Sequence, residues 1–147
     1  MDEGTWNTFP LRRSTIDLDE NISRCPETWS IVQQCPLLRG VSGGVYFSIM
    51  YPSTHVRPHC GPSNLKRRYH LTLEEADGAR IRSGDQWRTW QEGECLILDD
   101  SFEHEVQHRG DRKRVVLIID CWHPDLNEHE RDFLARLHLV WRRDELA

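Results

Sequence analysis

The segment that decides the fold is Arg114-Val115-Val116-Leu117-Ile118-Ile119-Asp120-Cys121. The uninterrupted apolar run Val115 to Ile119 is typical of a central strand that is covered on both faces. Directly upstream, His104 to His108 is a second β-prone run, and Arg109-Gly110-Asp111 separates the two. We therefore predict that these strands form an antiparallel hairpin with its turn near Gly110.

Further β-prone runs precede this pair. They cover residues 45–50, 67–73, 79–82, 86–90 and 95–98. The turn residues Ser83-Gly84-Asp85 indicate a hairpin between the third and fourth of these runs. About seven short strands at close spacing predict an all-β fold, a β-sandwich or double-sheet jelly roll.

Helical and irregular segments flank the strands. Residues 1–21 are polar and predicted to be irregular, with Trp6, Phe9 and Leu11 docking on the core, and residues 26–34 predict a short helix that starts at a proline. After Pro124, Asn127 and Glu130 have the spacing of a capping box. The helix that follows carries Phe133, Leu134, Leu137 and Trp141 on one face and is expected to pack on a sheet. We expect one domain over residues 1–147, with its core at about 43–124 and this helix at about 127–142.

Composition narrows the class of protein. The chain has 147 residues, 37% of them hydrophobic, and a net charge of -5, which argues against nucleic acid or an anionic membrane as the main partner. No apolar run approaches the ~20 residues that span a bilayer, and no apolar signal region is seen at the N-terminus, so a cytoplasmic location is expected. The five widely spaced cysteines are expected to be reduced thiols.

Two histidines are the candidate metal ligands. His59 lies in Pro58-His59-Cys60-Gly61-Pro62-Ser63-Asn64, and His104 lies in Asp99-Asp100-Ser101-Phe102-Glu103-His104-Glu105-Val106. Two imidazoles bind iron, zinc or copper and leave coordination positions open for other ligands.

The residue types around this pair leave two questions open. Non-heme iron sites usually add a carboxylate two residues after the first histidine, and here that position is Gly61. A water or a nearby carboxylate would have to replace it. The local candidates are Asp99, Asp100, Glu103 and Glu105, of which the two glutamates would point away from His104 on a strand. His55 is the rival first ligand, because it would share a face with His59 on a straight strand.

An arginine close to such a metal predicts an anion between them. With a turn near Gly110, Arg114 would nearly face His104 across the expected hairpin. A dicarboxylate such as 2-oxoglutarate would chelate the metal at one end and form a bidentate pair with Arg114 at the other. Arg68 and His70 share one face of their strand and could hold the nearer carboxylate, and Ser48 could add a hydroxyl.

Several segments carry a resemblance to a known family. They are Tyr46-Phe47-Ser48-Ile49-Met50, the run from Thr54 to Asn64, Arg68-Tyr69-His70-Leu71, Trp90-Gln91-Glu92-Gly93-Glu94, the run from Asp99 to Val106, and Asp120-Cys121-Trp122-His123-Pro124. In this order they closely resemble the aspartyl/asparaginyl β-hydroxylases, from about Trp6 to Leu126.

The resemblance implies a double-stranded β-helix (jelly roll, cupin-like) that uses Fe(II), 2-oxoglutarate and O2 and lacks the usual carboxylate ligand, as Gly61 would require. By motif position, His59 and His104 resemble the iron ligands, and Arg114 with Ser48 resembles the binding site for the distal carboxylate. Arg68 and His70 resemble the pair at the chelating end, and Trp6 resembles a tryptophan of the same pocket. Gln107 and Thr72 depart from the pattern, where a tryptophan and a glycine are common.

The implied activity is hydroxylation of the β-carbon of aspartyl or asparaginyl residues by a 2-oxoglutarate-dependent dioxygenase. A substrate carboxylate would favour a cation, and Lys66 or Arg68 is the candidate. Two alternatives stay open: a related hydroxylase of a free or carrier-bound amino acid or a lipid acyl chain, and a catalytically silent jelly-roll binding module.

Overall fold

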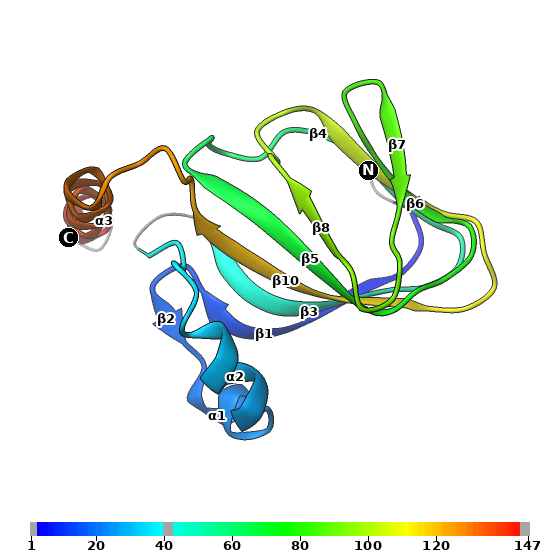
Figure 1. The fold of residues 1–147 in the computed structure, drawn as a ribbon, viewed down its shortest axis with the longest axis horizontal. Coiled ribbons are helices and arrows are strands. Elements are labelled where there is room, and N and C mark those ends of the chain that lie inside the picture. The colour runs from blue at the N-terminus through cyan, green and yellow to red at the C-terminus, as the bar shows by residue number, and fades with distance from the viewer. Residues whose placement is uncertain (1–2, 40–42, 145–147) are drawn as a thin grey trace.

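Two antiparallel β-sheets face each other in the structure, a computed structural model that describes residues 3–39 and 43–144 (Figure 1). The larger sheet has the strand order β2-β1-β3-β10-β5-β8, formed by β2 (Ile16–Asp17), β1 (Trp6–Arg13), β3 (Gly44–Met50), β10 (Arg114–Trp122), β5 (Lys66–Glu74) and β8 (Cys95–Leu98). The smaller sheet has the order β4-β9-β6-β7, formed by β4 (Thr54–His59), β9 (His104–His108), β6 (Ala79–Ser83) and β7 (Gln86–Thr89).

The main core lies between the two sheets. Val56, Ile81 and Val106 of the smaller sheet form one buried cluster with residues of the larger sheet such as Val116 and Ile118. Full burial of one such aliphatic side chain is worth about 1.5–3 kcal/mol relative to exposure. Because β3 to β10 are distributed over the two sheets in the order of a double-stranded β-helix, the predicted jelly roll is confirmed.

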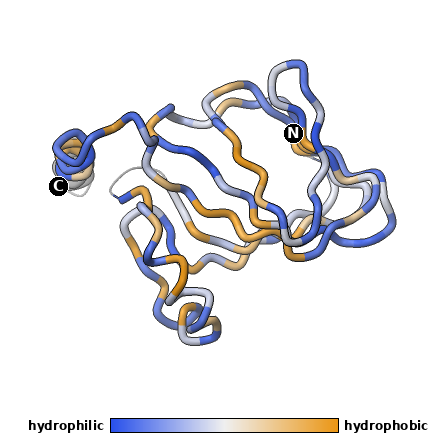
Figure 2. Tube along the Cα trace, viewed as in Figure 1, coloured by the Kyte–Doolittle hydropathy of each residue, from blue (hydrophilic) through white to orange (hydrophobic). Residues whose placement is uncertain are grey.

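A second core covers the outer face of the larger sheet. There Leu11 and Leu117 pack with Val32 of α2 (Pro26–Val32), and Ile22 of α1 (Asp19–Ser23) packs against the same cluster. Both helices lie beneath β1 in Figure 1. Figure 2 shows the hydrophobic residues concentrated along the central strands of this sheet. The prediction that Val115 to Ile119 is a central strand covered on both faces is therefore confirmed, since Val116 and Leu117 enter different cores.

The predicted hairpin between residues 104–108 and 114–121 is wrong. Both strands exist, but β9 pairs with β4 and β6, whereas β10 pairs with β3 and β5 in the other sheet. The intervening loop crosses between the sheets and packs on the turn before β6, where the N–H of Arg109 donates to the carbonyl of Gly78 at 2.9 Å. His108 is buried and donates from Nε2 to the carbonyl of Arg112 at 2.5 Å.

The N-terminal segment also differs from the prediction. Residues expected to be irregular form β1, which pairs with β3 from Trp6↔Met50 to Arg13↔Gly44. A register shift between Pro10 and Arg12 accommodates the proline, which cannot donate to the sheet. Pairing with a neighbouring strand, which local sequence does not reveal, decides this element.

The remaining local predictions are confirmed. β6 and β7 form the predicted hairpin, with Ser83 paired to Gln86 and Gly84 at a φ of 55° in the turn. The predicted helix over residues 26–34 is α2, which begins at Pro26.

The C-terminal helix, α3 (Glu128–Asp144), begins at the predicted capping box. The N–H of Asn127 donates to Glu130 at 2.8 Å, and the N–H of Glu130 donates to Asn127 Oδ1 at 3.0 Å. The expected packing on a sheet is wrong, because Phe133 is 64% exposed and Figure 1 shows the helix standing apart from both sheets. The side chain of Trp141 lies outside the described residues. Within the described ranges, no helix is long and apolar enough to cross a membrane.

Candidate active site

A β-bulge brings the two candidate metal ligands onto one face. In the pairing of β4 with β9, Val56 is opposite Val106 and His59 is opposite His104, so β4 has one extra residue between these pairs. The extra residue reverses the alternation of side chains along β4. His59 therefore lies beside His104, with 4.2 Å between the ring centroids, although it is the fourth residue after the outward-facing His55.

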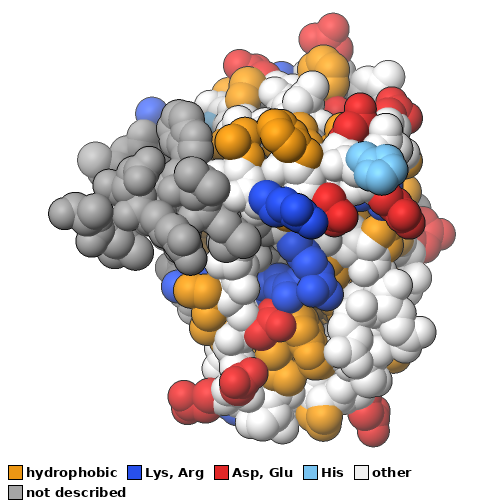
Figure 3. All heavy atoms as spheres, turned by 90° about the vertical axis from the view of Figure 1, so that its left-hand side faces the viewer, with side chains coloured by type: hydrophobic (Ala, Val, Ile, Leu, Met, Phe, Trp, Pro, Cys, Tyr) orange, Lys and Arg blue, Asp and Glu red, His pale blue; other side chains and the backbone are white. Residues whose placement is uncertain are grey.

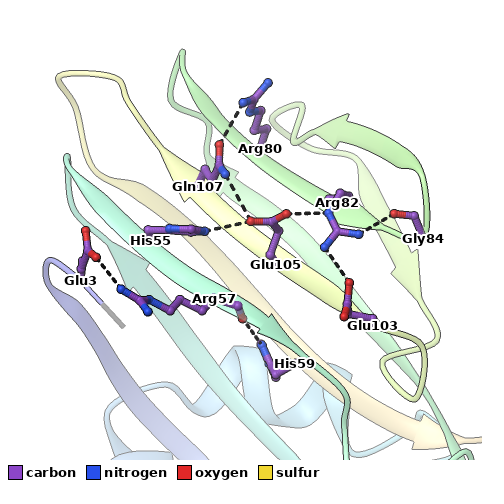
Figure 4. Close-up of polar contacts among 10 residues, drawn as sticks. All are labelled: Glu3, His55, Arg57, His59, Arg80, Arg82, Gly84, Glu103, Glu105 and Gln107. Atoms are coloured by element: carbon purple, nitrogen blue, oxygen red, sulfur yellow. Dashed lines mark hydrogen bonds and ion pairs between the residues drawn. The ribbon is translucent and has the colours of Figure 1, made fainter. Parts of the chain in front are cut away.

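The rival ligand His55 is placed elsewhere. Its Nε2 lies 2.9 Å from Glu105 Oε2 on the outer face of the smaller sheet (Figure 4). Because the carboxylate accepts this hydrogen bond, Nε2 carries the proton and cannot bind a metal in this arrangement.

Backbone carbonyls fix the tautomer of both paired histidines. His59 donates from Nδ1 to the carbonyl of Arg57 at 2.8 Å, and His104 donates from Nδ1 to the carbonyl of Phe102 at 2.9 Å (Figure 4 for His59). A carbonyl can only accept, so Nε2 of each neutral ring keeps its lone pair. Burial lowers the pKa of His104, which also favours the neutral, metal-binding form.

Asp100 occupies the space beside Gly61. A Cβ added at Gly61 would lie 2.6 Å from the carboxylate carbon of Asp100, so this site has no room for the side chain that would usually supply the third ligand. Asp100 itself is 1% exposed and pairs with Lys66 and Arg68.

The other carboxylate candidates are also paired elsewhere. Asp99 binds Arg67, and Glu103 and Glu105 bind Arg82 on the outer face, as expected for residues that flank His104 on a strand. Among the described residues, no group of three or more His, Cys, Asp or Glu side chains could hold a metal ion. A metal at this position would therefore rest on the two histidines and on ligands from outside the chain.

Arg114 is a buried cation that, among the described residues, has the neutral Ser48 hydroxyl as its hydrogen-bond partner. It is 2% exposed, donates from Nη2 to Ser48 Oγ at 3.0 Å, and lies over the ring of Trp90 at 4.4 Å. The same hydroxyl oxygen accepts a hydrogen bond from Trp6 Nε1 at 2.8 Å. No ion pair of Arg114 is found among the described residues, and burial lowers its pKa to about 10. A buried charge without a counter-ion is costly, so this position favours an anionic ligand.

His70 adds a hydrogen-bond donor beside it. Trp90 donates from Nε1 to His70 Nδ1 at 3.2 Å, so the proton of the neutral ring is on Nε2. That Nε2 is buried and has no hydrogen-bond partner. Burial, with Arg114 and Arg68 nearby, holds the pKa of His70 well below its usual value. A carboxylate oxygen in the cavity would satisfy this donor.

Arg68 and Lys66 are held by two buried carboxylates. Arg68 donates to Asp120 from Nε at 2.8 Å and from Nη2 at 3.0 Å, and its Nη1 lies 3.1 Å from Asp100. Lys66 Nζ lies 3.2 Å from the same carboxylate oxygen of Asp100 and is 1% exposed. These contacts fix the position of the Arg68 guanidinium. Lys66 is buried more deeply than expected for a side chain that binds a substrate directly.

Seven of the eight residues singled out in the sequence line one narrow cavity of about 50 Å³. These are Trp6, Ser48, His59, Arg68, His70, His104 and Arg114. A wider groove of about 440 Å³ adjoins it, shares Trp6, Tyr46 and Arg68 with it, and includes Lys66. Figure 3, which views the left-hand side of Figure 1, shows Lys and Arg side chains gathered at the centre of that face between hydrophobic and acidic ones. A larger cleft of about 580 Å³ between β7 and β8 contains none of the eight.

Sequence reasoning missed the residues that orient this set. Trp90 stacks near His70 and under Arg114, and Asp120 holds Arg68. Trp90 and Asp120 lie within quoted motifs, but only the fold reveals what they contact. His123, also within a quoted motif, accepts the N–H of Asp125 at its Nδ1 at 3.3 Å.

The fold and the site define a jelly-roll protein with a two-histidine, arginine-containing cavity. A solved structure with the same fold is described as a predicted oxalate decarboxylase from Thermotoga maritima, with a TM-score of 0.54, 11% identity, and coverage of 83% of this chain and 84% of that one.

Comparison with protein families gives the narrower assignment. The family model for aspartyl/asparaginyl beta-hydroxylase matches residues 1–124, and the chain belongs to this family. It is 38% identical over 92% of its length to human aspartyl/asparaginyl beta-hydroxylase, and 41% identical over 81% to the ornithine lipid ester-linked acyl 2-hydroxylase of Rhizobium tropici. The chain spans 18% of the human protein and 42% of the bacterial one.

Proposed function

We propose that this chain is an Fe(II)- and 2-oxoglutarate-dependent dioxygenase that hydroxylates the β-carbon of aspartyl or asparaginyl residues. The observation that carries the proposal is Arg114, a buried guanidinium that the described chain provides with a hydroxyl partner and no carboxylate. Such a charge favours a ligand carboxylate in the cavity that Arg114 shares with the histidine pair.

The residues present fit both an iron ion and 2-oxoglutarate. The free Nε2 atoms of His59 and His104 suit a divalent transition metal, because their Nδ1 protons are already held by carbonyls. Arg114 and Ser48 suit one carboxylate of a dicarboxylic acid, and the unpartnered Nε2–H of His70 suits an oxygen of the same molecule. When bound, iron with 2-oxoglutarate and O2 supplies an oxidation that yields succinate and CO2 and puts one oxygen atom into a C–H bond of the substrate.

The chain itself contributes orientation and exclusion of water. Arg114 and Ser48 fix one end of the 2-oxoglutarate, and Trp90 holds both the Arg114 guanidinium and the His70 ring in place. Ile81, Leu98 and Val106 line the same cavity and keep it dry, which strengthens each of these polar contacts. No side chain here is required to act as a general acid or base.

The adjoining groove is the proposed substrate site. Trp6 and Tyr46 stand where the groove meets the narrow cavity, so a side chain passing between them would reach the histidine pair. Arg68 is the candidate partner for a substrate carboxylate, because its guanidinium lines both spaces. Lys66 would act through Asp100, which both cations contact.

The decisive experiment supplies Fe(II), 2-oxoglutarate and O2 to the purified chain and follows succinate by NMR. Peptides containing Asp or Asn are then screened for a mass increase of 16. We expect succinate formation that requires iron and is lost in His59→Ala and His104→Ala. Full turnover in His59→Ala with iron bound would contradict the assignment. Absence of succinate in the native chain would favour a silent binding module.

A second candidate is hydroxylation of a lipid acyl chain. It is favoured by the 41% identity to the Rhizobium tropici acyl hydroxylase and by the side chains of Trp6, Pro10 and Tyr46 along the groove. Including fatty acids and ornithine-containing lipids in the same mass-shift screen distinguishes the two substrates.

A further inference from the structure

Glu105 is the centre of a polar network on the outer face of the smaller sheet (Figure 4). Its carboxylate accepts hydrogen bonds from Arg82 Nε at 2.6 Å, His55 Nε2 at 2.9 Å and Gln107 Nε2 at 3.2 Å. These partners come from β6, β4 and β9, so one carboxylate joins three adjacent strands. Its side chain is 11% exposed, which shields these contacts from water.

The network lies where the backbone pairing of β4 with β9 is interrupted. The bulge in β4 falls between Val56 and His59, and His55 is the residue just before that interval. A bulge leaves one residue unpaired and loosens the local ladder. The His55–Glu105 contact ties β4 to β9 on the outer face, directly behind the strand residues that carry His59 and His104.

We propose that Glu105 is a positioning residue that sets the spacing of the His59–His104 pair by holding β4 against β9 across the bulge. Glu105 directly follows His104 in the chain, and its bond to His55 fixes the strand that carries His59. Loss of the carboxylate would free β4 at the bulge and widen the distribution of distances between the two rings. The inference rests on the proposed function in so far as this pair binds a metal.

The neighbouring Glu103 provides a matched control. It flanks His104 on the other side and also accepts a hydrogen bond from Arg82 Nη2 at 2.9 Å, but among the described residues no hydrogen bond or ion pair joins its side chain to β4. Its side chain is 58% exposed, so its ion pair contributes little stability. Glu103→Ala therefore removes a carboxylate beside the ligand and leaves the tie between β4 and β9 intact.

The first test measures binding of Co(II) alone to the full chain, followed by its visible absorption. We expect Glu105→Ala and His55→Ala each to weaken Co(II) binding by about 10- to 100-fold, the range typical for residues that orient metal ligands. Combining them should add little to either change alone, because both remove the same contact. Glu103→Ala should stay within about threefold of the native chain. Equal losses in Glu103→Ala and Glu105→Ala, or fully additive losses in the double variant, would overturn the proposal.

The second test needs no metal. Amide hydrogen exchange of a peptide covering residues 54–60, read by mass spectrometry in the apo protein, should become at least several-fold faster in Glu105→Ala than in Glu103→Ala. Unchanged exchange in a folded Glu105→Ala protein would refute the role of Glu105. A native chain that binds no Co(II) would instead refute the proposed function, and the exchange result would still decide whether Glu105 holds β4.

Discussion

Replacing Arg114 with methionine separates stability from ligand binding. The change removes a guanidinium that is 2% exposed and keeps an unbranched side chain that can lie over Trp90. Burial lowers the pKa of Arg114 to about 10 from 12.5, which corresponds to about 3 kcal/mol of destabilisation of the charged form at 1.4 kcal/mol per pKa unit. Removing the charge relieves that cost in the apo protein.

Two favourable contacts are lost in the same variant. The hydrogen bond from Arg114 Nη2 to Ser48 is worth about 1 kcal/mol, and the cation–π contact with Trp90 about another 1 kcal/mol. The net result expected for Arg114→Met is an apo protein that is equally stable or more stable by about 1 kcal/mol. For a chain of this size that corresponds to a rise of up to about 2–4 °C in Tm.

Binding of 2-oxoglutarate should change in the opposite direction. Truncating one partner of a buried charge pair costs about 2–5 kcal/mol, so the affinity should fall by at least about 30-fold. Differential scanning calorimetry of the apo protein and calorimetric titration with 2-oxoglutarate in the presence of Co(II) measure the two effects. Exposed Arg13, on the rim of the groove, is the matched control, and Arg13→Met should alter neither quantity appreciably. An apo protein destabilised by more than about 2 kcal/mol, with unchanged 2-oxoglutarate affinity, would show that Arg114 is a structural residue.

Three further predictions follow from other parts of the molecule. Burial holds the pKa of folded His70 well below its usual value, so the unfolded chain binds more protons than the folded chain below pH 6.5. Acidification from pH 7.5 to about 5 should therefore lower the free energy of unfolding measured with urea, and His70→Gln should reduce that loss. Gly61→Asp should lower Tm and weaken Co(II) binding, because the Cβ of the new side chain would lie 2.6 Å from the carboxylate carbon of Asp100. Tighter Co(II) binding in this variant would disprove the steric argument. Phe133→Ser replaces a side chain on α3 that is 64% exposed and should change the free energy of unfolding by less than about 0.5 kcal/mol. A loss of several kcal/mol in urea unfolding would show that this face of α3 is buried against other residues.

Local chemistry in the sequence predicted most of the strands and the candidate site residues. The aliphatic run from Val115 to Ile119 is stable as a strand buried between two cores. Turn and capping residues such as Gly84 and Asn127 determine the backbone only within a few residues of their own position. The histidines and Arg114 were identifiable because few other side chains bind metals or carboxylates in this way. Each of these inferences depends on short-range physics or on residue type.

The partners of each strand and the direction of each side chain required the tertiary structure. One extra residue in the bulge of β4 turns His59 toward His104 and His55 away from it, and no local signal fixes that phase. The crossing of the chain between sheets after His108 places Arg114 in the cavity without a hairpin. Asp100 and Asp120, distant in sequence from Arg68, neutralise it only once β5 pairs with β8 and β10. Such contacts are set by burial and pairing summed over the whole domain. The sequence therefore indicated candidate site residues, whereas the fold decided how they meet.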